Sequence, residues 1–456
     1  MSRPLEIIVL AAGKGSRMHS SLPKVLHDLA GRPLLSHVLD TARTLKPRRI
    51  HVVVGHGGEQ VREQLNHPDL LFHEQIEQLG TGHAVGCALP YCDNASIILV
   101  LFGDVPLITS SSLHDLVAAA EQGPAMLAAD CPDPSGYGRV ITDASGAFVA
   151  VVEETDADIR QRSITLVNTG LLAAPGPLLN QLLARIGNDN AQGEYYLPDV
   201  LGLARQEGTL VSVATIGDTT EFLGVNDRSQ LEQLERALQQ RLAGQLLKSG
   251  VALRDRQRLD IRGELQCGRD VAIDVNVVFE GRVVLSDGVR VGAHCVLRDV
   301  EVGPGTDIQP FCHIEGACIG ADCRVGPYAR LRPGTHLDQA ARVGNFVETK
   351  NSRLGKGSKA NHLAYLGDTQ VGESSNVGAG TITCNYDGLN KYPTVLGDGV
   401  FVGSNSTLVA PLELANDSFV AAGSVLTENV AASQLAVGRS RQRNIPGWRR
   451  PGDKGQ

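Results

Sequence analysis

From about residue 271 to residue 426, aliphatic residues recur at every sixth position of the chain. A period of six fits neither the alternation of a half-buried strand nor the 3.6-residue period of an amphipathic helix, so it predicts stacked coils of short β-strands. Glycine directly after several of these residues, as in Val291-Gly292, suits a corner where a Cβ would crowd the turn. Two series keep the spacing without a slip: Ile319, Val325, Leu331, Leu337 and Val343, then Leu396, Val402, Leu408, Leu414, Val420 and Leu426.

Residues 1 to about 226 instead alternate short apolar runs with helical patterns, which is typical of an α/β sheet. Helices are expected at Pro33–Thr44 and Gly80–Leu89. The expected strands are Glu6–Leu10, Ile50–Val54, Ile97–Phe102, Ala125–Ala129 and Phe148–Val152.

Between these two regions, leucines return in steps of three or four among Gln, Glu and Arg, which predicts one long helix over residues 227–249. The chain is therefore expected to divide into an α/β domain over residues 1–226, this linker helix, and a β-coil domain over residues 250–456. The last of these ends in an irregular basic tail from Ser440. A chain of 456 residues also exceeds what a single core fills, which agrees with two domains.

Composition narrows the classes of partner and location. The net charge of -8 argues against nucleic acid or an anionic membrane as a general partner, so any anionic ligand must be met by local cations. The nine cysteines are scattered without C-x-x-C spacing, which favours a reduced, cytoplasmic protein over a disulfide or zinc framework. We expect neither a signal peptide nor a membrane span, because no apolar run approaches the ~20 residues that a span needs.

The first expected strand runs into a glycine-containing turn, Leu10–Met18 (LAAGKGSRM), with Lys24 shortly after it. Such a turn lets backbone N–H groups approach a phosphate, and Arg17 and Lys24 would neutralise its charge. The segment is not a Walker A loop, and it misses the dinucleotide fingerprint because Met18 stands at the third glycine position. Taken alone, it is also compatible with an ordinary strand-to-helix turn that carries solvated basic residues.

A carboxylate follows the most apolar of the expected strands, in Gly103-Asp104-Val105-Pro106. Open α/β sheets bind ligands beyond the carboxyl ends of their strands, so Asp104 is placed to hold a hard cation. Mg²⁺ takes oxygen ligands of this kind. An aspartate after a strand also serves as a turn residue or helix cap, and the strand alone leaves both roles open.

The six-residue ladder breaks in two places, and reactive side chains gather there. The spacing falters between Val343 and Val377, around His362, and slips by one residue between Val377 and Leu396. Insertions in solenoids form loops, often on the binding face. Histidine can act as a general base near neutral pH, so His362 is the candidate for proton transfer at this break. By itself, a loop histidine is equally compatible with a solvated surface residue.

Several motifs together carry a family resemblance. The segments Leu10–Met18, Pro23-Lys24, Gln75 with Leu79–Ala84, and Gly103–Pro106 resemble sugar-phosphate nucleotidyltransferases. With hexapeptide repeats behind them, residues from about 5 to 450 resemble the bacterial family of bifunctional N-acetylglucosamine-1-phosphate uridyltransferase/glucosamine-1-phosphate acetyltransferases. The resemblance implies a Rossmann-like nucleotidyltransferase (nucleotide-diphospho-sugar transferase) domain followed by a left-handed parallel β-helix.

The resemblance also implies an activity. Acetyl transfer from acetyl-CoA to glucosamine 1-phosphate would come first, and Mg²⁺-dependent uridylyl transfer from UTP would follow with release of pyrophosphate. The product would be UDP-N-acetylglucosamine for the cell envelope. Such enzymes are cytoplasmic homotrimers in which acetyl transfer takes place between neighbouring coils.

The resemblance implies site residues at the matching positions. Asp104 and Asn226 would be the Mg²⁺ ligands. By itself, however, Asn226 before Asp227 is typical of a turn or helix cap. The residues implied for UTP and UDP-N-acetylglucosamine are Leu10, Ala11, Ala12, Gly13, Arg17, Lys24, Gln75, Gly80, Thr81, Phe102, Gly103, Asp104, Gly138, Glu153, Asn168 and Asn226. With His362 as the base, the acetyl acceptor would meet Arg332, Lys350, Tyr365, Asn376, Asn385, Tyr386 and Lys391, and acetyl-CoA would meet Ala379, Ser404, Ala422 and Arg439.

Two alternatives compete with this interpretation. One is a nucleotidyltransferase with hexapeptide repeats but without acetyltransferase activity, against which His362 and Asn385-Tyr386 argue. The other treats the β-coil as an oligomerisation scaffold only.

Overall fold

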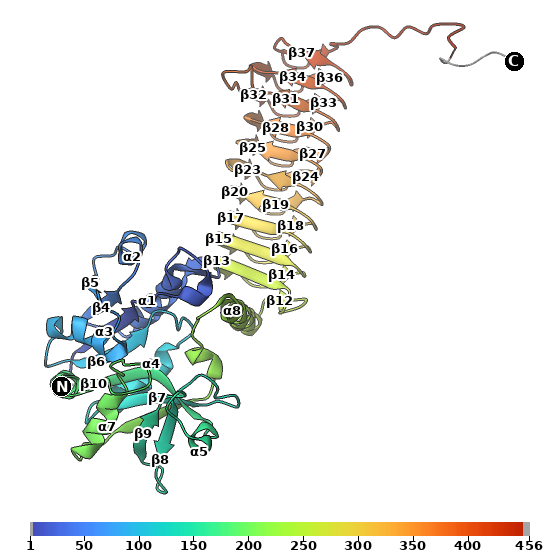
Figure 1. The fold of residues 1–456 in the computed structure, drawn as a ribbon. Helices are drawn as coiled ribbons and strands as arrows, with labels where there is room; N and C mark the ends of the chain where they lie inside the picture. Colours follow the sequence, from blue (N-terminus) through green and yellow to red (C-terminus); the bar gives the residue numbers. More distant parts are fainter. Residues whose placement is uncertain (1–2, 450–456) are drawn as a thin grey trace. The chain divides into compact units, whose positions relative to one another are not determined.

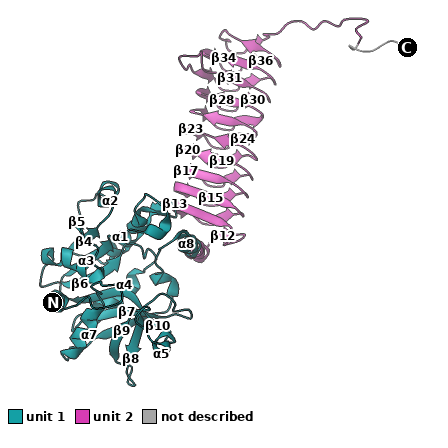
Figure 2. Ribbon diagram, viewed as in Figure 1, with its two compact units in different colours: residues 1–238 teal, residues 239–456 magenta. Residues whose placement is uncertain are grey.

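A computed structural model describes residues 3–449, and the chain folds as two compact units, residues 1–238 and 239–456 (Figure 2). The first unit carries a mixed sheet covered by helices, and the second is a solenoid of short strands (Figure 1). The architecture confirms the predicted fold class, and the parallel pairing throughout the solenoid agrees with a left-handed parallel β-helix.

Strand β1 (Leu5–Ala11) lies inside the sheet of the first unit, parallel to β4 (Arg49–Val54) and β6 (Ile97–Phe102). The sheet order is β11-β7-β10-β6-β1-β4-β5, and only β10 runs antiparallel to both its neighbours on this path. Both faces of the sheet are covered, so Ile7, Ile8 and Val9 are all fully buried. The other strands are β5 (Leu70–Glu74), β7 (Ala125–Asp130), β8 (Arg139–Thr142), β9 (Phe148–Val152), β10 (Leu166–Pro175), β11 (Ser212–Ile216), and the separate pair β2 (Asp28–Leu29) and β3 (Arg32–Pro33).

Two groups of helices supply the apolar residues that bury the two sheet faces. Helices α1 (Leu34–Thr44), α2 (Gly58–Gln64) and α4 (Ser110–Ala119) pack on the face of Ile7 and Val9. Helices α3 (Thr81–Ala88), α6 (Gly176–Leu183) and α7 (Asp199–Gln206) pack on the face of Ile8 and Leu10. The remaining helical segments are α5 (Ile159–Arg162) and the 3₁₀ turns η1 (Ser16–Met18), η2 (Lys24–Leu26), η3 (Leu89–Tyr91) and η4 (Thr219–Phe222). All the strands and helices expected from the sequence are therefore present.

Helix α8 (Arg228–Lys248) forms where one long helix was expected. Its last turns cover the amino-terminal end of the solenoid, where Ala243 is fully buried in the solenoid core. The buried Gln239 also closes this end, because its Nε2 donates to Ile261 O at 2.8 Å and its Oε1 accepts from Ile261 N at 2.8 Å. Ile261 belongs to the first coil, so no earlier coil can satisfy its backbone groups. The Gln239 amide takes that place.

The solenoid has three flat faces, and every strand pairs in parallel with the strand one coil away (Figure 1). One face holds β12 (Ala252–Leu253), β14 (Ala272–Ile273), β16 (Arg290–Val291), β18 (Asp307–Ile308), β21 (Arg324–Val325), β24 (Arg342–Asn345), β27 (Lys359–His362), β30 (Asn376–Val377), β33 (Phe401–Val402), β36 (Phe419–Val420) and β38 (Leu435–Ala436). The long strands β13 (Leu259–Cys267), β15 (Val277–Leu285) and β17 (Val296–Val302) then divide into two further faces. These hold β19 (His313–Glu315), β22 (Arg330–Leu331), β25 (Glu348–Lys350), β28 (Tyr365–Gly367), β31 (Ile382–Cys384), β34 (Thr407–Val409) and β37 (Val425–Leu426), and β20 (Ala317–Ile319), β23 (Thr335–Leu337), β26 (Arg353–Leu354), β29 (Thr369–Val371), β32 (Thr394–Leu396) and β35 (Leu412–Leu414).

The inward aliphatic residues explain the period read from the sequence. Val291, Ile308, Val325 and Val343 pair in register on successive coils, so one coil takes 17 or 18 residues, about three hexapeptides. All four are buried. Glycine follows such residues because the next coil passes directly against its Cα: a Cβ on Gly292 would lie 2.6 Å from Pro310 N.

The two breaks in the ladder have different causes. Between Val343 and Val377 the coils continue without an inserted loop, because Val343 pairs with Ala360 and Ala360 with Val377. The expectation of an insertion there was wrong: the spacing falters because Thr349 and Ala360 occupy inward positions. Between Val377 and its partner Val402 one coil is longer, and residues 385–393 form a loop that contains a bridge between Tyr386 and Lys391.

The close contact between coils at Gly344 leads to a prediction. A Cβ there would overlap the carbonyl oxygen and the Cα of Asn361. Gly344→Ala should therefore lower the free energy of unfolding of the solenoid by roughly 1–3 kcal/mol, measured by urea denaturation. Gly244→Ala on α8 is the control, because a Cβ there has no neighbour within 4 Å. Equal stability of the two variants would contradict the proposed contact.

Candidate active sites

A pocket of about 230 Å³ lies where the parallel strands of the first unit end. It is formed by the turn after β1, the end of β6 and the segment that joins β5 to α3. The predicted residues that line it are Leu10, Ala11, Ala12, Gly13, Lys24, Gln75, Gly80, Thr81, Phe102 and Asp104. The fold thus brings predicted residues from four separate stretches of chain around one pocket.

Lys24 lies between the two predicted metal ligands, Asp104 and Asn226. Its Nζ lies 2.5 Å from Asp104 Oδ2 and 3.3 Å from Asn226 Oδ1, and both charged side chains are mostly buried. Asn226 is held in turn by its backbone N–H, which donates to Gln230 Oε1 at 2.7 Å. One carboxylate and one amide oxygen therefore already face a single cation, and two hard oxygen donors are a fitting start to a Mg²⁺ site.

Two further polar residues that line the pocket, Gln78 and Glu194, were not foreseen from the sequence. Gln78 Nε2 donates to Ala12 O at 2.7 Å and ties the segment before α3 to the turn after β1. Glu194 comes from a distant loop that packs against Gly80, where a Cβ would lie 2.9 Å from the Glu194 Cβ. The position of Gln78 near Gln75 was a weak local signal, whereas no spacing in the sequence pointed to Glu194.

Three predicted sugar contacts lie together outside this pocket. Asn168 N donates to Gly138 O at 2.8 Å, and a Cβ on Gly138 would lie 3.0 Å from Glu153 Oε1. Glu153 lines a neighbouring pocket of about 340 Å³ together with Asp156 and Asp199. Burial raises the pKa of Glu153, and these two carboxylates raise it further. Ionised Glu153 is therefore less favourable here than an exposed glutamate carboxylate would be.

The structure places two other predicted residues away from the pocket lining. Arg17 is exposed on η1. Gly103 is buried, and its N–H donates to Leu10 O at 2.9 Å, so it joins the ends of β6 and β1. Neither is among the residues that line the 230 Å³ pocket.

On the solenoid, His362 ends β27 and is exposed. Its Nδ1 lies 2.7 Å from Asn345 Oδ1 on the preceding coil, where the two residues pair in register. An amide oxygen only accepts, so Nδ1 carries the proton of the neutral ring and Nε2 carries the lone pair. The coil stacking thus leaves one defined basic nitrogen.

The predicted coenzyme residues form one column with His362. Ala360, Val377, Val402 and Val420 pair in register, and His362, Ala379, Ser404 and Ala422 each follow two positions later. Arg439 comes directly after Gly438 on the next coil, where Gly438 N donates to Ser424 Oγ at 3.1 Å. Residues that are far apart in the sequence are therefore aligned along one corner of the solenoid.

A group of cations lies on the neighbouring face. The ammonium of Lys391 is the main cause that lowers the pKa of Lys350, with smaller contributions from burial and from Arg332. Arg332 itself pairs with Glu348 Oε1 at 2.9 Å. This crowding of positive charge at Lys350 would be relieved by an anion such as a phosphate.

Asp368 and Asn385 lie beside the cations Lys350 and Lys391. Asn385 is buried, and its Nδ2 donates to Asp368 Oδ2 at 2.5 Å. Burial raises the pKa of Asp368, but hydrogen bonds from Asn351 and Asn385 outweigh it and leave the pKa below its usual value. A Cβ on Gly367 would lie 2.5 Å from Tyr365 Oη and 2.8 Å from Asn385 Nδ2, so these two predicted side chains meet over a glycine.

The last two predicted acceptor residues are less closely joined. Tyr386 is exposed in the loop of residues 385–393, and its Oη donates to Gly388 O at 2.5 Å. Asn376 stands on β30, in register with Lys359 and Phe401. Within residues 3–449, no hydrogen bond joins the Asn376 side chain to the cation group.

The fold and the first site together define a nucleotidyltransferase, and the model of the MobA-like NTP transferase domain matches residues 7–253. Proteins named bifunctional protein GlmU are 54% identical in Dechloromonas aromatica, 53% in Azoarcus sp. and 53% in Stutzerimonas stutzeri, and each alignment covers 98–99% of this chain and 99–100% of the relative. The chain belongs to the GlmU family of bifunctional proteins. This confirms the predicted family, the enzyme class and the pair of transferase activities.

Two similar solved structures each match about half of this chain. A putative glucose-1-phosphate thymidylyltransferase from Bacillus anthracis covers 51% of this chain and 94% of its own, at 16% identity and a TM-score of 0.42. In residues 3–449, no helix combines the length and the apolar character that crossing a bilayer requires.

The cation group leads to a prediction about Lys350. Lys391→Met removes the charge that depresses its pKa most, so the pKa of Lys350 should rise towards the ordinary value of about 10.4. The ¹³C shift of the Lys350 ε-methylene, followed from pH 8 to 11 in protein with labelled lysine, measures this. Lys356→Met is the control and should leave the titration unchanged. An unaltered pKa in Lys391→Met would show that the two ammonium groups do not interact.

Proposed function

We propose that the first unit performs Mg²⁺-dependent uridylyl transfer and that the solenoid performs acetyl transfer to glucosamine 1-phosphate. In this division of labour residues 1–226 are the uridyltransferase domain, residues 227–249 the linker helix and residues 250–456 the acetyltransferase domain. The observation that carries the proposal is the Lys24 ammonium between Asp104 Oδ2 and Asn226 Oδ1, at the end of a sheet where nucleotides bind.

In the first unit, Asp104 and Asn226 would hold the metal, and the metal would supply charge neutralisation for the phosphates of UTP. Attack of a sugar 1-phosphate on the α-phosphorus joins two anions, so it needs positioning and positive charge rather than a nucleophilic side chain. Lys24 is free to turn from Asp104 towards a phosphate once another cation takes its place. Gln75, Gly80 and Thr81 line the pocket at the strand ends and would contact the uracil base. Gly138, Glu153 and Asn168 would contact the amino sugar, and Glu153 lines the neighbouring pocket.

In the solenoid, His362 Nε2 would take the proton of the substrate ammonium. The free amine then attacks the thioester carbonyl of acetyl-CoA, and the thiolate leaves. Arg332, Lys350 and Lys391 would bind the phosphate of the acceptor, and the column from Ala379 to Arg439 would follow the coenzyme. Tyr365, Asn376, Asn385 and Tyr386 would complete the acceptor site.

We further propose a homotrimer in the cytoplasm. Four ring side chains, His294, Phe311, Tyr328 and Phe346, stack along the corner position next to the His362 column, with centroids 4.8–5.3 Å apart. Phe346 is 56% exposed and Leu363 continues the stripe at 58%. A neighbouring solenoid would cover this stripe and add a wall beside His362.

The proposed location rests on the cysteines. Nine free cysteines support a reducing compartment.

The metal assignment is tested by Asp104→Asn. Loss of the carboxylate should lower Mg²⁺-dependent release of pyrophosphate from UTP and N-acetylglucosamine 1-phosphate by at least about 100-fold, while acetyl transfer stays intact. Asp115→Asn is the matched control, since Asp115 is exposed on α4. Full Mg²⁺-dependent activity in Asp104→Asn would show that the metal is held elsewhere.

The base is tested by His362→Ala, which should lower kcat of acetyl transfer by about 10²–10⁴-fold and leave pyrophosphate release unchanged. Asn345→Ala should give a smaller loss together with an altered pH profile, because Nδ1 then has no fixed acceptor. His336→Ala on another face serves as the control. Wild-type acetylation by His362→Ala would refute the assignment of His362 as the base.

A further inference from the structure

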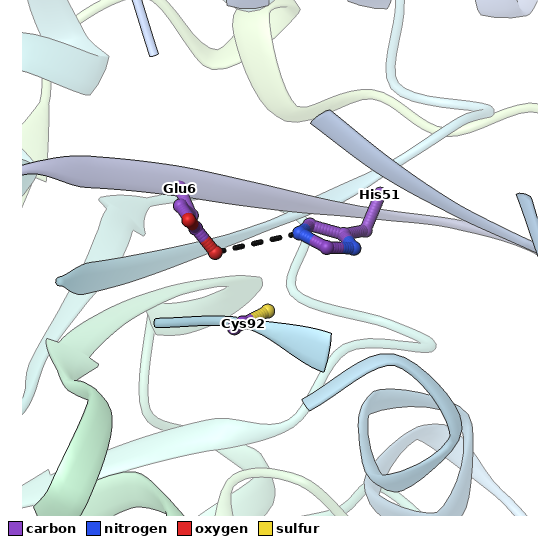
Figure 3. A group of neighbouring side chains, drawn as sticks. All are labelled: Glu6, His51 and Cys92. Carbon is purple, nitrogen blue, oxygen red and sulfur yellow. Dashed lines mark ion pairs between the residues drawn. The ribbon is translucent and has the colours of Figure 1, made fainter. Parts of the chain in front are cut away.

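A second group of ligand-type side chains lies in the first unit, away from the nucleotide pocket. Glu6 stands near the start of β1, His51 on the adjacent β4, and Cys92 directly after η3 (Figure 3). One carboxylate oxygen, one imidazole nitrogen and the thiol sulfur all lie within 4.8 Å of one another. Glu6 is four residues before Leu10 on the same strand, so the group sits towards the amino ends of strands whose carboxyl ends form the pocket.

The group contains polar atoms that are buried without hydrogen bonds. Glu6 and His51 are both 0% exposed. Glu6 Oε2 accepts from Asp93 N at 3.0 Å and lies 3.4 Å from His51 Nε2, but Glu6 Oε1 and His51 Nε2 have no hydrogen-bond partner. Among the residues described, His51 is the only ion-pair partner of this carboxylate. A buried carboxylate with an unpaired oxygen is costly unless a cation is supplied.

His51 also has the outer support that metal-binding histidines use. Its Nδ1 lies 2.9 Å from His73 Nε2, and the two rings stack with centroids 5.1 Å apart. The ring of Tyr91 lies tilted against that of His73, with centroids 4.7 Å apart. A hydrogen bond to the second ring nitrogen fixes the orientation of a ligating imidazole, and this one leaves His51 Nε2 directed at Glu6 (Figure 3).

We propose that Glu6 Oε1, His51 Nε2 and Cys92 Sγ bind one Zn²⁺, with water in a fourth position. A mixed O, N and S donor set suits Zn²⁺ and not Mg²⁺. Zinc bonds of about 2.0–2.3 Å need donors somewhat closer than the present spacing, so the three side chains close by rotamer adjustment. Cys92 is half-buried and gives the ion its entry, and the thiol proton leaves to solvent when the Cys92–zinc bond forms.

The site has a structural role in this proposal. It joins β1, β4 and the segment after η3, and Glu6, His51 and Cys92 are too far apart in the sequence for any ligand spacing to reveal them. Zinc that binds only the folded chain should raise the ratio of folded to unfolded protein about 100-fold when its free concentration is 100 times Kd.

The test uses the full-length, reduced and metal-stripped protein with excess Mg²⁺, which keeps the hard oxygen site occupied. Co²⁺ is titrated as a spectroscopic probe for zinc. We expect one Co²⁺ per chain, a near-ultraviolet thiolate-to-cobalt band, and displacement by Zn²⁺. X-ray absorption of the zinc form should show one sulfur at about 2.3 Å with nitrogen and oxygen ligands. This measurement uses the wild-type protein alone.

Variants locate the site. Cys92→Ser should lose the thiolate band, whereas Cys87→Ser on α3 should keep it. His73→Phe should weaken Co²⁺ binding by about 10–100-fold without removing the band at saturation. Pyrophosphate release reports that each variant is folded. Absence of stoichiometric Co²⁺ binding by the wild type, a band that persists in Cys92→Ser, or zinc without a sulfur ligand would each overturn the proposal.

Discussion

The direct stacking of backbone on backbone between successive coils is the constraint on which the solenoid depends. Where an inward aliphatic residue is followed by glycine, the next coil leaves no space for a Cβ, as at Gly292 and Gly344. Each coil is thereby held in register with its neighbours. Register in turn determines the chemistry: Asn345 meets His362 only because the two residues occupy the same place on adjacent coils.

The first unit solves the same problem of alignment with a different device. Its strands end at one edge of a sheet that is buried on both faces, and the turns beyond that edge bring Leu10, Lys24 and Asp104 together. Lys24 acts as an internal counterion for Asp104. Such a pair offsets the cost of burying a carboxylate, and another cation could take the place of the ammonium group.

Local patterns in the sequence predicted the elements well, because alternation, helical spacing and the six-residue period each report which side chains point inward. The period even located the solenoid corners. It misled in one place: Thr349 and Ala360 are inward residues of regular coils, and their polarity or small size looked like an interruption. A rule based on aliphatic residues cannot recognise an inward threonine whose hydroxyl is satisfied by Thr335, 3.0 Å away.

Contacts that depend on tertiary packing were beyond such reasoning. Glu194 reaches the pocket at the strand ends from a loop more than a hundred residues after Gly80, and only the folded chain brings the two together. Glu6, His51 and Cys92 looked like two strand residues and a stray thiol. The proposed site residues came mostly from the family resemblance, and the structure shows which of them contact one another.

The corner column that begins at His362 makes the solenoid a molecular ruler. Neighbouring strands are about 4.8 Å apart, so the positions from His362 to Ala422 mark off three steps of roughly 14 Å in all along the axis. Adding or removing a whole coil would change this length by one step and leave every corner in phase. Single-residue differences are absorbed locally, because β15 and β17 continue to pair after a one-residue shift in register. Evolution can thus adjust the reach of such a surface in discrete increments while the chemistry at its origin stays unchanged.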